Sequence, residues 1–241
     1  MTREEARKKI IFALDVETLA EAERWAELLA SHVGMFKIGK QLFTACGPDV
    51  VRAIRARGGD VFLDLKYHDI PNTVAMASVA AARLDVRLFN LHALGGFEMM
   101  ATSVAALKKA FPDADRPKLL AVTILTSSTE ETLRGVGIEL PVREMVVRLA
   151  TLAHKAGIDG VVASPLEVAL IREACGPDFL IVTPGVRPTF AAANDQKRIM
   201  TPAEAVQAGA DYLVIGRPIA AATDPVAAAE TIIDEIVAAV E

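Results

Sequence analysis

The chain of 241 residues is predicted to fold as one (β/α)8 barrel, in which eight parallel strands alternate with eight helices. A short apolar run, a turn and a helical stretch recur roughly every 25 to 30 residues, eight times in all. The apolar runs are continuous, which is typical of parallel strands that are covered on both faces. An open doubly wound sheet is the alternative. Such a sheet is expected to have a Gly-rich turn after its first strand, but the sequence at this position is Asp15-Val16-Glu17-Thr18.

The predicted elements follow from these runs in order. Strands are expected at 10–15, 35–39, 61–66, 88–93, 119–125, 160–163, 179–183 and 212–215. The helices that follow them are expected at 19–31, 41–57, 73–84, 97–110, 143–155, 166–174, 202–208 and 225–240. Gly47-Pro48 predicts a break in the second helix, because proline interrupts helical hydrogen bonding. No interdomain linker appears, so the predicted domain spans residues 1–241.

The composition argues against several kinds of partner. The net charge is −5 and no basic block is present, which speaks against nucleic acid and anionic membranes. No apolar run approaches the roughly 20 residues of a membrane span, and residues 1–9 lack the apolar core of a signal peptide. Cys46 and Cys175 are far apart and match no metal or disulfide spacing, so we expect both to be packing residues. A cytoplasmic protein is therefore expected.

One stretch, residues 64–73, concentrates ionisable groups at the end of the third strand. Alternate residues of a strand share a face, so Asp64 and Lys66 are predicted to point the same way and Leu65 the opposite way. Asp69 lies just beyond, where the chain turns, so three ionisable groups are expected to converge on one small volume. Buried charges are tolerated only when they are paired, which favours an active site here over ordinary core.

Other polar residues are expected at the same barrel mouth, because reacting groups of such barrels sit at the carboxyl ends of strands. Taken singly, each is compatible with a solvated strand end or an ion pair. Together with Asp64, Lys66 and Asp69 they predict an active site: Asp15, Lys37, Thr126, Ser127, Pro184, Arg187, Gly216 and Arg217. The glycines and arginines after strands seven and eight predict a phosphate site. Gln196, in the long loop, is placed to reach the same ligand, and a solvent-facing glutamine fits its spacing equally well.

The pattern of charges predicts the type of reaction. Neighbouring carboxylates hold Lys37 and Lys66 in their charged form, which disfavours a Schiff base and favours a positioned proton donor. A cation of this kind stabilises a developing negative charge. We therefore predict a reaction that generates a carbanion and protonates it. The histidines show no metal-ligand spacing, and no Ser-His-Asp order, P-loop or dinucleotide fingerprint is present.

The decamer Asp64-Leu-Lys66-Tyr-His-Asp69-Ile70-Pro-Asn-Thr73 closely resembles the signature of the orotidine 5′-phosphate decarboxylase family. The resemblance covers essentially the whole chain in the right order. It includes Phe12-Ala-Leu-Asp15, Phe36-Lys37-Ile-Gly39, Val122-Thr-Ile-Leu-Thr126-Ser127, Thr183-Pro-Gly-Val-Arg187, Asp195-Gln196 and Val214-Ile-Gly216-Arg217.

The resemblance implies decarboxylation of orotidine 5′-phosphate to UMP and CO2, the last step of de novo pyrimidine synthesis, without metal or organic cofactor. It implies that Lys66 protonates C6 of the pyrimidine, and that Asp64 and Asp69 crowd the substrate carboxylate. A homodimer is implied, in which the partner subunit supplies Asp69, Ile70 and Thr73. The remaining implied contacts are the ribose for Asp15 and Lys37, the base for Thr126 and Ser127, and the phosphate for Arg187, Gln196, Gly216 and Arg217, with Pro184 also against the substrate.

Three other functions stay open on the sequence. The charge pattern also fits a magnesium-dependent decarboxylase or synthase that acts on a sugar phosphate. A Schiff-base aldolase that uses Lys37 or Lys66 is the second alternative. The third is a non-catalytic nucleotide-binding barrel, although binding alone does not require alternating lysines and aspartates.

Overall fold

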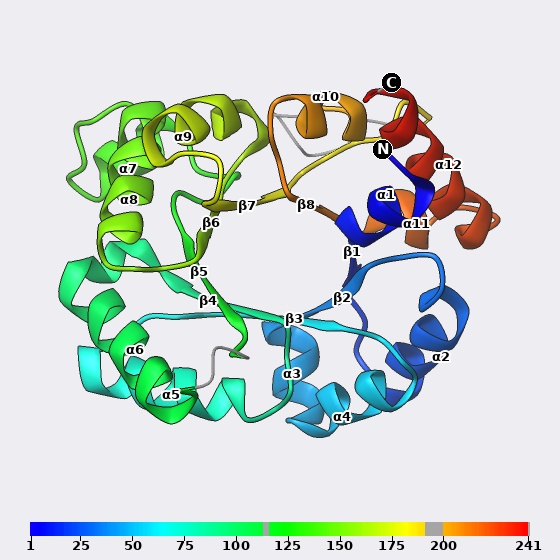
Figure 1. Ribbon diagram of the computed structural model, residues 1–241, viewed down its shortest axis with the longest axis horizontal. Coiled ribbons are helices and arrows are strands. Elements are labelled where there is room, and N and C mark those ends of the chain that lie inside the picture. Colours follow the sequence, from blue (N-terminus) through cyan, green and yellow to red (C-terminus); the bar gives the residue numbers. More distant parts are fainter. Residues whose placement is uncertain (113–115, 191–199, 241) are drawn as a thin grey trace.

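A computed structural model describes residues 1–112, 116–190 and 200–240. It contains a closed barrel of eight parallel strands that follow one another in sequence order, with β8 paired back to β1. Figure 1 shows the strands as a ring with the helices around its outside. The strands are β1 (Ile10–Leu14), β2 (Met35–Gly39), β3 (Val61–Tyr67), β4 (Leu88–His92), β5 (Lys118–Val122), β6 (Gly160–Val162), β7 (Leu180–Pro184) and β8 (Tyr212–Ile215). The predicted (β/α)8 fold is therefore confirmed.

The helices surround this ring. They are α1 (Arg3–Lys9), α2 (Leu19–Leu29), α3 (Lys40–Cys46), α4 (Asp49–Ala56), α5 (Pro71–Ala82), α6 (Gly96–Ala110), α7 (Glu130–Gly135), α8 (Val142–Lys155), α9 (Val168–Cys175), α10 (Pro202–Gln207), α11 (Arg217–Ala220) and α12 (Pro225–Ala238). Short 3₁₀ turns, η1 (Ala93–Gly95) and η2 (Pro165–Glu167), precede α6 and α9. The predicted break near Gly47-Pro48 is present and separates α3 from α4.

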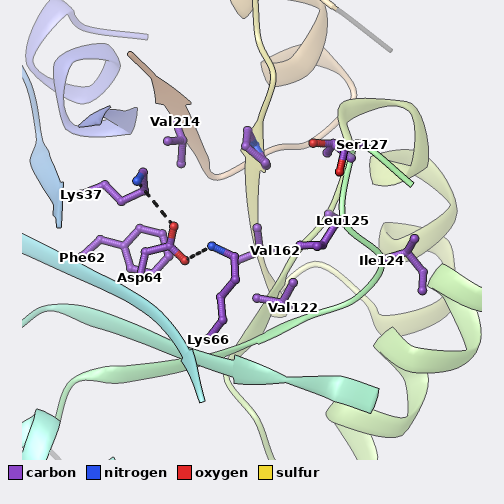
Figure 2. A pocket seen from close by; sticks show the side chains of 13 residues that line it. Lys37, Phe62, Asp64, Lys66, Val122, Ile124, Leu125, Ser127, Val162 and Val214 are labelled. Atoms are coloured by element: carbon purple, nitrogen blue, oxygen red, sulfur yellow. Dashed lines mark hydrogen bonds and ion pairs between the residues drawn. The ribbon is translucent and has the colours of Figure 1, made fainter. Parts of the chain in front are cut away.

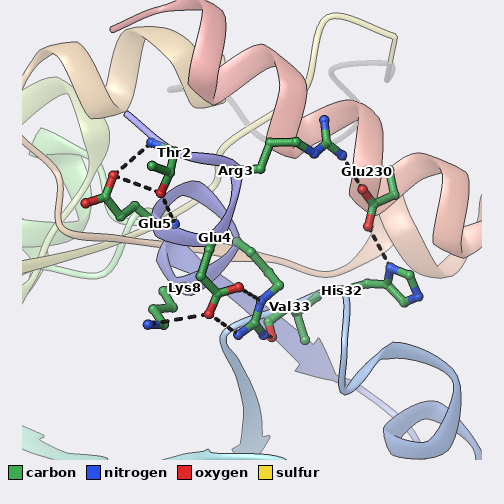
Figure 3. Close-up of polar contacts among 9 residues, drawn as sticks. Thr2, Arg3, Glu4, Glu5, Lys8, His32, Val33 and Glu230 are labelled. Carbon is green, nitrogen blue, oxygen red and sulfur yellow. Dashed lines mark hydrogen bonds and ion pairs between the residues drawn. The ribbon is translucent and has the colours of Figure 1, made fainter.

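Helices α1, α7 and α11 were not predicted. Helix α1 begins with a capping box, in which the Thr2 hydroxyl accepts a hydrogen bond from the Glu5 N–H (3.2 Å) and the Glu5 carboxylate accepts one from the Thr2 N–H (2.8 Å). Figure 3 shows this cap, and also Glu230 of α12 between Arg3 and His32. The Thr-x-x-Glu spacing is the sequence signal that predicts such a start. Helix α7 begins with the same kind of cap at Thr129 and lies in the stretch that was expected to be a polar loop.

Two apolar layers hold the barrel together. The larger one lies between strands and helices, and Cys46 and Cys175 pack in it as expected. The smaller one fills the barrel interior: Ile11, Ala13, Met35, Phe62, Leu88, Leu120, Val182 and Val214. Because side chains alternate along a strand, the next inward position lies two residues further toward the carboxyl end. That position is held by Asp15 directly after β1, and by Lys37, Asp64 and Asn90 on β2, β3 and β4.

Within the described residues, no helix has both the length and the apolar character that crossing a lipid bilayer requires.

Candidate active site

Four side chains of alternating charge lie side by side at the carboxyl ends of β1, β2 and β3. The Lys66 ammonium donates a hydrogen bond to Asp64 Oδ1 (2.6 Å), and Asp64 Oδ2 lies 3.6 Å from Lys37 Nζ. Lys37 Nζ in turn lies 3.5 Å from Asp15 Oδ1. Figure 2 shows Asp64 between the two lysines. We call Asp15, Lys37, Asp64 and Lys66 the charge array.

Asp64 is the centre of the charge array and is only 9% exposed. Burial by itself raises the pKa of the Asp64 carboxyl. The ammonium groups of Lys37 and Lys66, and hydrogen bonds from Lys66 and Asn90, outweigh burial and hold this pKa below its ordinary value. Asp64 is therefore ionised at neutral pH, and each of its oxygens faces one lysine.

The backbone at Lys66 departs from a regular strand. Its φ is +53°, a left-handed conformation that usually costs a non-glycine residue about 1 to 3 kcal/mol. The β3–β4 register shifts here: Leu63 pairs with Phe89 and Tyr67 with Leu91, so three residues of β3 lie opposite one of β4. Leu65 packs against the outer core, as predicted. Regular alternation does not continue through Lys66, however, and its side chain meets Asp64 by way of this irregularity.

The residue of β4 opposite the irregularity is Asn90, which the sequence analysis did not single out. Asn90 is fully buried. Its Oδ1 accepts a hydrogen bond from the Lys66 N–H (2.7 Å), and its Nδ2 donates one to Asp64 Oδ1 (2.7 Å). The sequence does contain a signal for Asn90. It is an amide inside an apolar strand, two residues beyond the inward-facing Leu88, and a buried amide needs a hydrogen-bond partner.

The charge array borders a cavity of about 220 Å³. Six predicted residues line it: Lys37, Asp64, Lys66, Thr126, Ser127 and Pro184. The rest of its wall is apolar and was not predicted, because the continuous apolar strands give no sign of which side chains face the cavity: Phe62, Val122, Ile124, Leu125, Val162, Ala163 and Val214. An apolar wall lowers the local dielectric constant and strengthens the action of nearby charges on a bound molecule.

The other predicted residues of the β3–α5 connection are not among those that line the cavity. Asp69 is exposed, and its Oδ1 accepts a hydrogen bond from the Ile70 N–H (2.6 Å). Ile70 is 67% exposed, and Thr73 in the first turn of α5 is exposed as well. The expected convergence of Asp69 with Asp64 and Lys66 therefore stays a prediction.

The predicted phosphate residues leave two neighbouring strands at the same level. Pro184 of β7 pairs with Val214 of β8, and Arg187 and Arg217 each follow three residues later. Arg187 is buried, whereas Arg217 is exposed at the start of α11. A Cβ on Gly216 would lie 3.5 Å from Asp15 Oδ2, so the end of β8 meets the charge array. Gln196 lies outside the described residues.

Two histidines lie near the charge array, His68 directly after β3 and His92 at the end of β4. The rings of His68 and His92 are 5.6 Å apart. Burial, followed by the nearby His68, Lys40 and Lys66, lowers the pKa of His92 to about 4, against an opposing effect of Asp64. His92 is therefore neutral at neutral pH and adds no charge to the array. Among residues 1–112, 116–190 and 200–240, no three His, Cys, Asp or Glu side chains gather as a set of metal ligands.

Comparison with known proteins identifies the family of the chain. A family model described as "Orotidine 5'-phosphate decarboxylase / HUMPS family" matches residues 8–232. The chain belongs to this family. Relatives named orotidine 5′-phosphate decarboxylase from Geobacter sulfurreducens and Geotalea daltonii are each 74% identical to it over 238 residues, which is 99% of this chain and all of the relative.

Solved structures agree with the family assignment. The crystal structure of orotidine 5′-phosphate decarboxylase from Lactobacillus acidophilus is 40% identical, with a TM-score of 0.82 over 94% of this chain and 98% of that one. The enzyme of the same name from Pyrococcus horikoshii is 26% identical and has a TM-score of 0.75 over the same shares. The family resemblance of the decamer at 64–73 is thereby confirmed.

Proposed function

We propose that this chain decarboxylates orotidine 5′-phosphate to UMP and CO2, the last step of de novo pyrimidine synthesis. The names of its family and of relatives 74% identical to it support the reaction. The observation that carries the proposal is the Asp64 carboxylate, held ionised between the ammonium groups of Lys37 and Lys66 at a cavity of the barrel mouth. This arrangement suits a reaction in which the negative charge of a carboxylate passes to a carbon atom as neutral CO2 leaves.

In the proposed reaction, the substrate carboxylate on C6 lies near Asp64, and the repulsion between them is relieved as CO2 leaves. The bond between C6 and the carboxylate breaks, and its electron pair stays on C6. The Lys66 ammonium stabilises this carbanion and donates a proton to it, which forms UMP. The neutral Lys66 amine then regains a proton from water. The hydrogen bond between Lys66 Nζ and Asp64 Oδ1 (2.6 Å) supports the position of the proton donor that this step needs.

The proposed substrate contacts follow the walls of the site. Thr126, Ser127 and Pro184 line the cavity and suit the base, and its apolar wall suits a pyrimidine ring. Lys37 and Asp15 suit the ribose hydroxyls, because Lys37 Nζ lies between Asp64 and Asp15 toward the exposed edge of the array.

For the phosphate we propose Arg187, Gly216 and Arg217. These residues follow the ends of β7 and β8, and the pairing of the two strands brings those ends together at one side of the barrel mouth. Gln196 belongs to the same proposal and lies outside the described residues. Phosphate binding far from C6 supplies energy that organises the site around the reacting bond.

We also propose a homodimer in which Asp69, Ile70 and Thr73 complete the partner's active site. Three large apolar side chains near this loop support it, since Ile70, Leu94 and Phe97 are 67%, 44% and 49% exposed. The loop and these residues lie close together, because a Cβ on Gly95 would lie 3.4 Å from the His68 ring. An apolar patch of this kind is typical of a subunit interface.

The direct test is incubation of the purified protein with orotidine 5′-phosphate and EDTA, followed by the absorbance change on formation of UMP. We expect turnover with the chelator present. Activity that EDTA abolishes and magnesium restores would favour the magnesium-dependent alternative. Substrate trapped on a lysine by borohydride would favour the aldolase, and UMP binding without any turnover would favour the non-catalytic barrel.

A further inference from the structure

We propose that Asn90 is a positioning residue for the proton transfer, because it orients both Lys66 and Asp64. This inference rests on the proposed function and extends it to a residue outside the charge array. A single buried amide makes two hydrogen bonds of opposite sense, accepting at Oδ1 from the Lys66 N–H (2.7 Å) and donating at Nδ2 to Asp64 Oδ1 (2.7 Å). Its neighbours determine its orientation, since a backbone N–H only donates and an ionised carboxylate only accepts.

The first of these bonds holds the backbone of Lys66. Between the pairs Leu63–Phe89 and Tyr67–Leu91, β4 has only Asn90 to face three residues of β3. In this interval the Lys66 N–H bonds the side chain of Asn90, while the Lys66 backbone adopts a φ of +53°. A strained conformation of this kind persists only where its surroundings hold it in place. Asn90 thereby determines the direction in which the Lys66 side chain leaves the strand.

The second bond holds the carboxylate. Asp64 Oδ1 accepts from both Asn90 Nδ2 (2.7 Å) and Lys66 Nζ (2.6 Å), while Oδ2 faces Lys37 Nζ at 3.6 Å. Because Oδ1 is held between two donors, rotation of the carboxyl group is restricted, so Oδ1 stays with Lys66 and Oδ2 with Lys37. Asparagine suits this position because it supplies a donor and an acceptor without a charge that would disturb the array.

Asn90→Asp keeps one of the two hydrogen bonds and removes the other, because aspartate has nearly the same shape as asparagine but lacks the N–H donor. One oxygen still accepts from the Lys66 N–H, but the other replaces the Nδ2 donor beside Asp64 Oδ1. Two carboxylates so close must share a proton, and their pKa values move apart. We expect kcat at pH 8 to fall at least roughly 100-fold and to recover roughly tenfold or more as the pH is lowered to about 5.5, where the shared proton restores the bond.

Asn90→Ala removes both bonds and is compared with Ser103→Ala. Ser103 is also fully buried, and its hydroxyl donates to the Met99 carbonyl (2.8 Å) in α6. Both variants should lose thermal stability. We expect only Asn90→Ala to lose kcat, by roughly 100-fold or more, with UMP affinity within about threefold of the wild type. The loss in kcat without a loss in affinity is what a purely structural role would not produce.

Full activity in either Asn90 variant, or a loss in Asn90→Asp with a wild-type pH profile, would overturn the inference. If Asn90→Ala does not fold, the pH profile of Asn90→Asp decides alone. Wild-type protein that fails to decarboxylate orotidine 5′-phosphate would remove the proposed function, and the inference with it. Active wild type beside active variants would remove the inference only.

Discussion

Lys66 combines an unusual backbone conformation with the more exposed side chain of the two lysines that flank Asp64. Its side chain is 23% exposed, against 12% for Lys37. A lysine that exchanges a proton with substrate and then with water needs contact with both, whereas a lysine that only holds charge does not. The left-handed φ therefore lies at the residue proposed to donate the proton, and backbone strain is commonly found at functional residues of this kind.

The proposed role of Arg217 rests on one charged group at the end of β8. We predict that Arg217→Ala weakens UMP binding by about 1.5 to 3 kcal/mol, or roughly 10- to 150-fold, since a charge-assisted hydrogen bond to the phosphate is lost. Uridine binding should change by less than about threefold. Calorimetry with both ligands measures the difference, and Arg134→Ala in α7 is the control. Equal weakening of UMP and uridine would place Arg217 away from the phosphate.

At the scale of the element, strands β6 and β7 approach so closely that one position accepts only glycine. Gly160 pairs with Leu180, and a Cβ on Gly160 would lie 2.2 Å from the Leu180 carbonyl oxygen. We predict that Gly160→Ala lowers the free energy of unfolding by about 1 to 3 kcal/mol, because backbone atoms of a closed barrel must move apart.

Urea unfolding provides the measurement, and Gly135→Ala is the matched control. A Cβ on Gly135 would meet no atom within 4 Å, so alanine there should leave the free energy of unfolding unchanged or slightly higher. An identical urea midpoint for Gly160→Ala and the wild type would show that the barrel opens at this point without strain.

The elements also show what the sequence can and cannot predict. Continuous apolar runs identified all eight strands, because parallel strands buried on both faces leave little room for polar residues. Helices α1 and α7 were missed because their short lengths give little periodicity, although their capping residues were visible. The bulge at Lys66 could not be predicted, because it depends on the register between β3 and β4.

The charge array illustrates the same limit within the site. Asp15, Lys37 and Asp64 follow from strand ends and alternation, which are local properties of the chain, whereas Lys66 meets Asp64 by way of the irregularity in β3. The place of Asp69 depends on the direction of a turn, and the contribution of Asn90 depends on a neighbouring strand. Contacts that depend on how two elements are placed relative to each other could therefore not be predicted from the sequence.

The proposed dimer predicts complementation between two inactive proteins. Lys66→Ala and Asp69→Asn should each be nearly inactive alone. In a mixed dimer, one site combines the intact Lys66 of one chain with the intact Asp69 of the other. Random reassociation of equal amounts should therefore recover about a quarter of the wild-type activity. No recovery after exchange of subunits, confirmed by differently tagged chains, would mean that Asp69 acts on its own chain or not at all.

The proposed mechanism depends on Lys66 delivering the proton to C6. Turnover of orotidine 5′-phosphate by Lys66→Ala, measured beside its affinity for UMP, tests this directly, with the exposed Lys108→Ala of α6 as control. We predict that kcat falls at least about 100-fold while UMP affinity stays within about tenfold, or 1.4 kcal/mol. A Lys66→Ala protein that still converts orotidine 5′-phosphate at the wild-type rate would contradict the mechanism.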